Sequence, residues 1–168
     1  HQSNIDPPLL AASLPRRIHF MAKKGIFHDP VVAFLLKSYG VFPLNRDGGD
    51  LAAISWALGR LQRNAAVTLF PEGTRSPGAM RKAMPGISMI ALRSGAPILP
   101  VGITGSERMG PIWRVAVPTG EFRVKIGHPF SLPPVESKIS REKLESATTM
   151  IMERVAVLLP KSYRGAYA

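Results

Sequence analysis

Two strings in this sequence contain residue types suited to acid–base chemistry, and the first stands at its start. The sequence begins H-Q-S-N-I-D, so His1 lies five positions before Asp6, which two prolines follow. Asp before Pro predicts a helix start, and His1 would have to lie in the preceding turn for its ring to meet the carboxylate. A carboxylate that holds one imidazole nitrogen leaves the other free to act as a base. Taken alone, the pair favours the alternative of a capping aspartate beside an exposed histidine.

The second string, F-P-E-G-T-R-S at residues 70–76, directly follows a predicted strand. Glu72, Thr74 and Arg75 offer an acceptor, a hydroxyl and a guanidinium around Gly73, where backbone amides can approach a ligand. This set suits a phosphate or a glycerol hydroxyl. It is not a nucleoside-triphosphate loop, because no Lys-Ser or Lys-Thr pair completes that pattern. The alternative is an ordinary strand-end turn with an ion pair.

Predicted strands and predicted helices alternate along the chain, which is typical of an α/β fold. These elements must position the two strings. We predict one domain over residues 1–168, with a mixed, mostly parallel sheet flanked by helices. A loop at the carboxyl edge of such a sheet is where α/β proteins bind ligands. The predicted strands are Ile18–Ala22, Val41–Asn45, Ala66–Phe70, Ile98–Thr104 and Phe122–Ile126.

Helix starts are predicted from capping residues and prolines, and buried helix faces from the spacing of apolar residues. The predicted starts are Asp6-Pro7, Asp29-Pro30, Asp50, Met84-Pro85 and Ser140, with stops at Gly40 and Gly95. The expected apolar stripes are Leu51, Ile54, Leu58 and Leu61 in one helix, and Leu144, Ile151, Val155 and Leu158 in the last.

The composition limits which kinds of catalytic or metal site the protein can have and which partners it attracts. The net charge of +11 attracts nucleic acid, anionic lipid headgroups or phosphorylated substrates, and it does not choose among them. The absence of Cys excludes disulfides, a thiolate nucleophile and Cys-ligated metals. His19, His28 and His128 have no partner at metal-ligand spacing, so we expect no metal site. The apolar runs are far shorter than the ~20 residues that span a bilayer.

The two strings together resemble the glycerolipid acyltransferases, specifically the 1-acyl-sn-glycerol-3-phosphate acyltransferase family. H-x-x-x-x-D and F-P-E-G-T-R are the first and third blocks of this family. G-V-F-P-L-N-R at residues 40–46 is similar to the second block, and A-P-I-L-P-V at 96–101 to the fourth. F-M-A-K-K at residues 20–24 is similar to a basic segment of the bacterial members.

The resemblance implies a role for each of these residues. His1 would be the base and Asp6 its orienter. The substrate phosphate would be bound by Arg46, Glu72, Gly73, Thr74, Arg75 and Lys24, with Lys23 next to Lys24 as the alternative lysine. The fourth block would place Pro97 and Pro100 near the acyl donor. The implied fold is that of the glycerolipid acyltransferases.

The implied reaction moves an acyl group from acyl-CoA or acyl-ACP to the sn-2 hydroxyl of 1-acyl-glycerol-3-phosphate, giving phosphatidate in phospholipid biosynthesis. No cofactor is expected. With no Cys, and no Ser in a nucleophile-elbow string, we expect direct attack by the bound alcohol rather than an acyl-enzyme. The sequence does not identify the hydrogen-bond donors that stabilise the oxyanion. The candidates are backbone amides near Glu72–Thr74 and near Pro97.

The expected partners are lysophosphatidate, an acyl thioester, acyl carrier protein as a possible donor, and an anionic membrane surface on the cytoplasmic side. No nucleic-acid partner is expected. We expect a membrane-associating segment upstream of His1, because the sequence has no initiator Met. Two alternatives stay open. One is the same chemistry on glycerol-3-phosphate or another lysolipid, and the other is a non-catalytic basic module that binds anionic membrane or nucleic acid.

Overall fold

The computed structural model describes residues 1–45, 50–110, 119–133 and 139–168. The chain forms two compact units. Unit 1 consists of His1–Leu14 and Phe70–Ala168, and unit 2 consists of Pro15–Leu69. The single domain over residues 1–168 stays a prediction, and each unit is described by itself.

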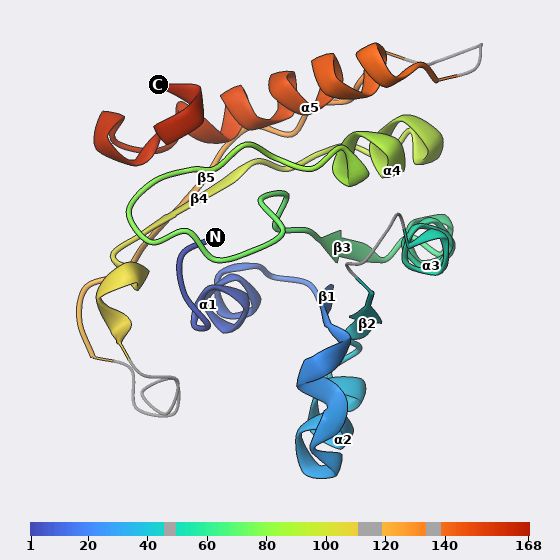
Figure 1. Ribbon diagram of the computed structural model, residues 1–168, viewed down its shortest axis with the longest axis vertical. Helices are drawn as coiled ribbons and strands as arrows, with labels where there is room; N and C mark the ends of the chain where they lie inside the picture. Colours follow the sequence, from blue (N-terminus) through green and yellow to red (C-terminus); the bar gives the residue numbers. More distant parts are fainter. Residues whose placement is uncertain (46–49, 111–118, 134–138) are drawn as a thin grey trace. The chain divides into compact units, whose positions relative to one another are not determined.

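Unit 2 contains a three-stranded parallel sheet in the order β2-β1-β3 (Figure 1). Met21 of β1 lies opposite Phe42 of β2, and Ile18 lies opposite Ala66 of β3. Helices in the two connections make consecutive β-α-β crossovers, which confirms the predicted α/β class with parallel strands. The elements in chain order are β1 (Ile18–Lys23), η1 (Lys24–His28), α2 (Pro30–Ser38), β2 (Phe42–Leu44), α3 (Leu51–Gln62) and β3 (Ala66–Thr68).

Local capping determines where the helices of unit 2 begin. The Asp29 carboxylate accepts hydrogen bonds from the amides of Val31 and Val32, both at 2.9 Å. Asp50 accepts from the amide of Ala53 at 3.0 Å. These bonds satisfy amides that have no partner within the first helical turn, so both predicted starts are confirmed.

The buried face of α3 is centred on two alanines rather than on the predicted leucine stripe. Ala53 and Ala57 are almost fully buried, whereas Leu51 is 72% exposed. Trp56 of the same helix stacks on Phe42 of β2, with 4.9 Å between ring centroids. Small residues allow the helix to lie close to its neighbours, which rotates Leu51 into solvent. The prediction that Leu51 is buried is therefore wrong.

The described residues of unit 1 form an antiparallel pair of strands, β4 and β5, and three α-helices. Val101 lies opposite Ile126, and Thr104 lies opposite Arg123. In the described residues no helix is both long enough and apolar enough to cross a membrane. The elements are α1 (Asp6–Ser13), α4 (Gly86–Ser94), β4 (Val101–Thr104), η2 (Ser106–Met109), β5 (Arg123–Ile126), α5 (Arg141–Ala156), η4 (Lys161–Tyr163) and η5 (Gly165–Tyr167).

The core of unit 1 forms along α5. One cluster centres on Met152 and Leu159, and a second joins Ile151 to Ala91 of α4. The hydroxyl of Ser88 on α4, fully buried, lies 2.8 Å from that of Thr148 on α5. These contacts fix α4 on α5, and α4 begins where the loop over residues 71–85 ends.

The fourth predicted strand is shorter than expected. β4 starts at Val101 rather than Ile98, because Pro100 has no N–H group to donate to a neighbouring strand. Ile98 still exchanges two backbone hydrogen bonds with Phe130, at 2.7 and 3.0 Å, as an isolated bridge.

Candidate active site

His1 and Asp6 are in direct contact at the start of unit 1. The Nδ1 of His1 lies 2.7 Å from the Oδ2 of Asp6, and the Asp6 side chain is fully buried. The same oxygen accepts from the amides of Gln2 and Ser3, at 2.6 and 3.0 Å. Because a carboxylate can only accept hydrogen bonds, Nδ1 must carry the proton. Nε2 of the neutral ring is then the basic nitrogen.

Asp6 does not act as a helix cap. α1 begins at Asp6 itself, and its N-cap residue is Ile5. A capping carboxylate accepts from amides ahead of it, as Asp29 and Asp50 do in unit 2. The Asp6 carboxylate is instead turned back toward the residues before the helix. The alternative of a capping aspartate beside an exposed histidine is therefore wrong.

The string over residues 70–76 holds His1 at three points. The ring of Phe70 stacks on the imidazole, with 4.1 Å between centroids and 26° between planes. The carbonyl of His1 accepts from the amide of Ser76 at 2.8 Å. Its main-chain nitrogen lies 2.8 Å from the Oε1 of Glu72, whose side chain is 6% exposed. These contacts restrict the ring to the orientation in which it meets Asp6.

A tight turn at Gly73 shapes this string. The Gly73 amide donates to the carbonyl of Phe70 at 3.0 Å, and its φ of +68° lies in the left-handed region. A Cβ at this position would lie 2.5 Å from the Sδ of Met84. The positive φ favours glycine here, because a Cβ is strained in this region, whereas the flexible Met84 side chain could move aside. Thr74 and Arg75 follow the turn and are exposed to solvent.

The remaining predicted residues lie at several places. Arg46 is outside the described residues. Lys24 is exposed at the start of η1, in unit 2. Pro97 is exposed and Pro100 is buried, both shortly before β4 in unit 1. Unit 1 thus brings together His1, Asp6 and the string over residues 70–76.

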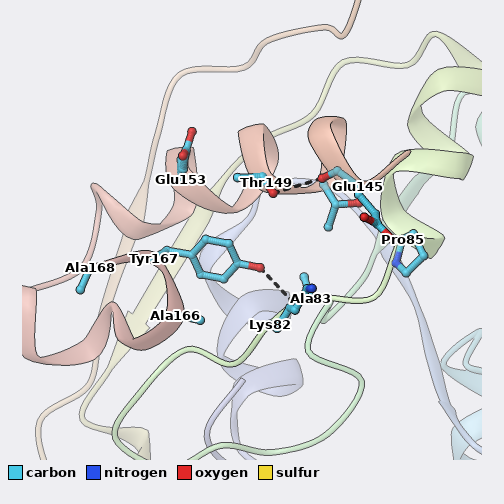
Figure 2. A pocket seen from close by; sticks show the side chains of 10 residues that line it. Lys82, Ala83, Pro85, Glu145, Thr149, Glu153, Ala166, Tyr167 and Ala168 are labelled. Atoms are coloured by element: carbon cyan, nitrogen blue, oxygen red, sulfur yellow. Dashed lines mark hydrogen bonds between the residues drawn. The ribbon is translucent and has the colours of Figure 1, made fainter. Parts of the chain in front are cut away.

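A surface pocket of about 420 Å³ lies beside α5 (Figure 2). The hydroxyl of Tyr167 accepts from the amide of Ala83 at 2.9 Å on one side of it. None of its lining residues belongs to the two strings, so the pocket is separate from the His1–Asp6 pair. The lining residues are Lys82, Ala83, Pro85, Glu145, Thr148, Thr149, Glu153, Ala166, Tyr167 and Ala168.

Another buried histidine, His19, lies in β1 of unit 2. Its ring is edge-on to Trp56 at 6.2 Å, and burial, followed by the positive charge of Arg60, lowers its pKa. Across the described part of the chain, no three His, Asp or Glu side chains gather in a group that would hold a metal ion.

Comparison with known protein families identifies the family of this chain. The family model described as Acyltransferase matches residues 1–104, which include both strings. The chain belongs to the acyltransferase family. The resemblance to this family that the sequence indicated is confirmed.

Two relatives of this acyltransferase are both named 1-acyl-sn-glycerol-3-phosphate acyltransferase. A 1-acyl-sn-glycerol-3-phosphate acyltransferase from Bacillus subtilis is 27% identical over 145 residues, which are 86% of this chain and 70% of that protein. A chloroplastic 1-acyl-sn-glycerol-3-phosphate acyltransferase from Brassica napus is 32% identical over 133 residues. That match covers 77% of this chain and 38% of the Brassica protein.

The fold of this acyltransferase is similar to that of a crystal structure from Thermotoga maritima. That structure is the 1-acyl-sn-glycerophosphate acyltransferase PlsC, and the TM-score is 0.65 at 29% identity. The match covers 94% of this chain and 62% of the PlsC chain. The chain thus spans less than two thirds of the PlsC chain and of the Brassica relative.

The sequence did not predict that the Gln2 side chain links distant segments of this acyltransferase. Its Oε1 accepts from the amide of Gly78 at 3.0 Å, and its Nε2 donates to the carbonyl of Ile103 at 3.2 Å. Gln2 therefore ties the His1–Asp6 turn to the loop after Arg75 and to β4. The Gln2 side chain has both a donor and an acceptor, which indicated that it could form hydrogen bonds near His1 and Asp6. The neighbouring sequence did not show that its partners are Gly78 and Ile103.

Proposed function

We propose that this chain is the catalytic domain of a 1-acyl-sn-glycerol-3-phosphate acyltransferase, one domain over residues 1–168. It transfers an acyl group from an acyl thioester to the sn-2 hydroxyl of lysophosphatidate and releases phosphatidate. The contact between His1 and the buried Asp6 carries the proposal, because it leaves one imidazole nitrogen as a base. The names of the relatives support the choice of acceptor.

The proposed mechanism is direct attack by the acceptor alcohol. Nε2 of His1 removes the hydroxyl proton as the oxygen forms a bond to the thioester carbonyl carbon. The resulting imidazolium is stabilised by Asp6, whose Oδ2 is 2.7 Å from Nδ1. Collapse of the tetrahedral intermediate breaks the carbon–sulfur bond, and the imidazolium returns its proton to the leaving thiolate. The base is thereby restored without a cofactor or a covalent acyl-enzyme.

The acceptor phosphate has its proposed contacts after the turn at Gly73. Arg75 can bind it with two parallel hydrogen bonds, and the Thr74 hydroxyl adds a donor. We propose Arg46 and Lys24 as further cationic contacts. Glu72 has a different proposed role, because its buried carboxylate contacts the main-chain nitrogen of His1 and a negative charge repels phosphate. We assign it to positioning His1.

The acyl donor is proposed to lie near Pro97 and Pro100, as acyl-CoA or acyl-ACP. The proposed location of the protein is the cytoplasmic face of a membrane. The net charge of +11 supports attraction to anionic headgroups. No nucleic acid is proposed as a partner.

Thiol release from an acyl thioester tests the proposed function. We expect release that depends on lysophosphatidate, with phosphatidate as the lipid product by mass spectrometry. Glycerol-3-phosphate and lysophosphatidylcholine serve as competing acceptors in parallel reactions. Faster release with either would replace the proposed acceptor, and no acceptor-dependent release from the folded protein would refute acyl transfer.

Arg75→Ala is expected to weaken acceptor binding by about 10–100-fold, the effect of losing a charge-assisted hydrogen bond to phosphate. The Michaelis constant for lysophosphatidate should rise while that for the thioester changes little. Arg75→Lys should recover part of the loss, because it keeps the charge without the paired geometry. Arg93→Ala, an exposed arginine of α4, is the matched control. A rise confined to the thioester constant would reassign Arg75 to the donor.

A further inference from the structure

One helix of unit 2 exposes an apolar side to solvent. None of the residues of α2 is buried, and Phe34 is 72% exposed and Val31 66%. Figure 1 shows η1 and α2 extending away from α3 within this unit. We call this surface the apolar face of α2, and it consists of Val31, Val32, Phe34, Leu35 and Tyr39, the last at the C-cap.

These residues form one continuous surface rather than scattered exposed positions. At 100° per residue, Phe34, Val31 and Leu35 are neighbours on one side of the helix, and Val32 and Tyr39 extend it. Ala33 and Leu36, which are partly buried, lie on the other side. Single exposed apolar residues are common on proteins, but a contiguous patch of this kind marks an interaction surface.

Cationic residues lie at both ends of α2. Lys23 and Lys24 are exposed just before it, at the start of η1. At the other end Lys37 is exposed, and the guanidinium of Arg17 donates to the carbonyl of Ser38 at 3.1 Å.

The acidic side chain at the start of α2 is already engaged. Asp29 is the only Asp or Glu between residues 15 and 45, and its carboxylate caps α2. The surface therefore combines an apolar face with exposed lysines close to it in the chain.

We infer that the apolar face of α2 inserts into the headgroup region of an anionic phospholipid bilayer. Apolar side chains enter the acyl boundary, and the lysines at the helix ends contact phosphates. A second copy of this chain would bring the same positive charges together, which disfavours self-docking. The inference rests on the proposed function in one respect, the choice of a lipid bilayer as the partner. A lysolipid acceptor would reach the enzyme from a bilayer.

Two kinds of attraction then act together. Charge alone gives reversible binding that salt abolishes, because screening is effective within about 8–10 Å at ordinary ionic strength. Apolar insertion adds a component that salt does not screen. Binding to anionic vesicles should therefore weaken with salt but persist in part.

The absence of Cys allows a single labelling site to be introduced. Phe34→Cys carries an environment-sensitive fluorophore, and Leu51→Cys on α3 is the control, because both parent side chains are 72% exposed in the same unit. We expect a blue shift at position 34 with phosphatidylcholine–phosphatidylglycerol vesicles, a weaker one with phosphatidylcholine alone, and none at position 51. No shift at position 34 while the protein sediments with vesicles would overturn the inference. So would a shift that appears without vesicles as protein concentration rises.

A second pair of variants measures the strength of the contact. Val31→Ser combined with Phe34→Ser should lower the vesicle partition coefficient at least about tenfold, and Leu51→Ser should not. Equal losses in both would refute a specific role for α2. Acyl transfer to a short-chain, water-soluble acceptor is assayed beside sedimentation. If the protein binds vesicles but does not transfer an acyl group, the proposed function alone is refuted. If it transfers an acyl group but position 34 does not contact the vesicles, this inference alone is refuted.

Discussion

Replacing His1 with alanine is expected to lower turnover by about 10²–10⁴-fold, the usual contribution of a positioned base. Nε2 is the basic nitrogen of the ring, because Nδ1 donates to Asp6 at 2.7 Å. Without the imidazole, the hydroxyl proton must leave to water as the oxygen attacks. The loss should appear in the rate constant for transfer more than in the Michaelis constants, because no binding contact to either substrate is assigned to this ring.

His128→Ala is the matched control for His1→Ala. His128 is exposed in the same unit, directly after the end of β5. We expect it to retain the parent rate. Steady-state thiol release with both substrates varied gives the two constants, and circular dichroism checks the fold. Near-normal turnover in folded His1→Ala would remove the base from the mechanism.

Asp6→Asn is expected to lower turnover by about 10³-fold. Two unit charges about 4 Å apart attract by ~4 kcal/mol at an effective dielectric of about 20, and the imidazolium in the transition state loses this attraction. The fold should persist, because the amide oxygen can still accept the hydrogen bonds that Oδ2 receives. Asp6 Oδ1 has no hydrogen-bond partner among the described residues, so the amide nitrogen can take its place.

Asp29→Asn is the control for this substitution, since Asn caps a helix about as well as Asp. Its turnover should match that of the parent. Nitrogen NMR of the His1 ring in Asp6→Asn should still show the proton on Nδ1, which would separate loss of charge from loss of the tautomer. If Asp6→Asn and Asp29→Asn had equal rates, the electrostatic role of Asp6 would be wrong.

Features that depend on neighbouring residues were predictable from the sequence. The starts of α2, α3 and α5 follow from Asp29, Asp50 and Ser140, because an N-cap side chain bonds amides two or three residues ahead. The contact of His1 with Asp6 has the same local origin. Its geometry required a turn before α1, and the spacing of five positions in the sequence indicated that turn.

Features that depend on distant residues were not predictable from one sequence. The burial of Ala53 and Ala57 instead of Leu51 depends on what α3 packs against. The bond from Gly78 to Gln2 joins residues that no local pattern connects. The contact between Glu72 and the main-chain nitrogen of His1 was not predictable for the same reason, because the two residues are 71 positions apart.

The two parts of the candidate site meet in unit 1 although all of unit 2 lies between them in the chain. Residues 1–14 and 70 onward are joined through residues 15–69. Forming the bonds of His1 with Glu72 and Ser76 therefore closes a long loop, at an entropic cost that grows only with the logarithm of its length. Doubling that length would cost about 0.6 kcal/mol more. Residues inserted into the turns of unit 2 would thus add little to this cost, whereas removing residues from its strands or helices would break the packed structure that separates the two strings.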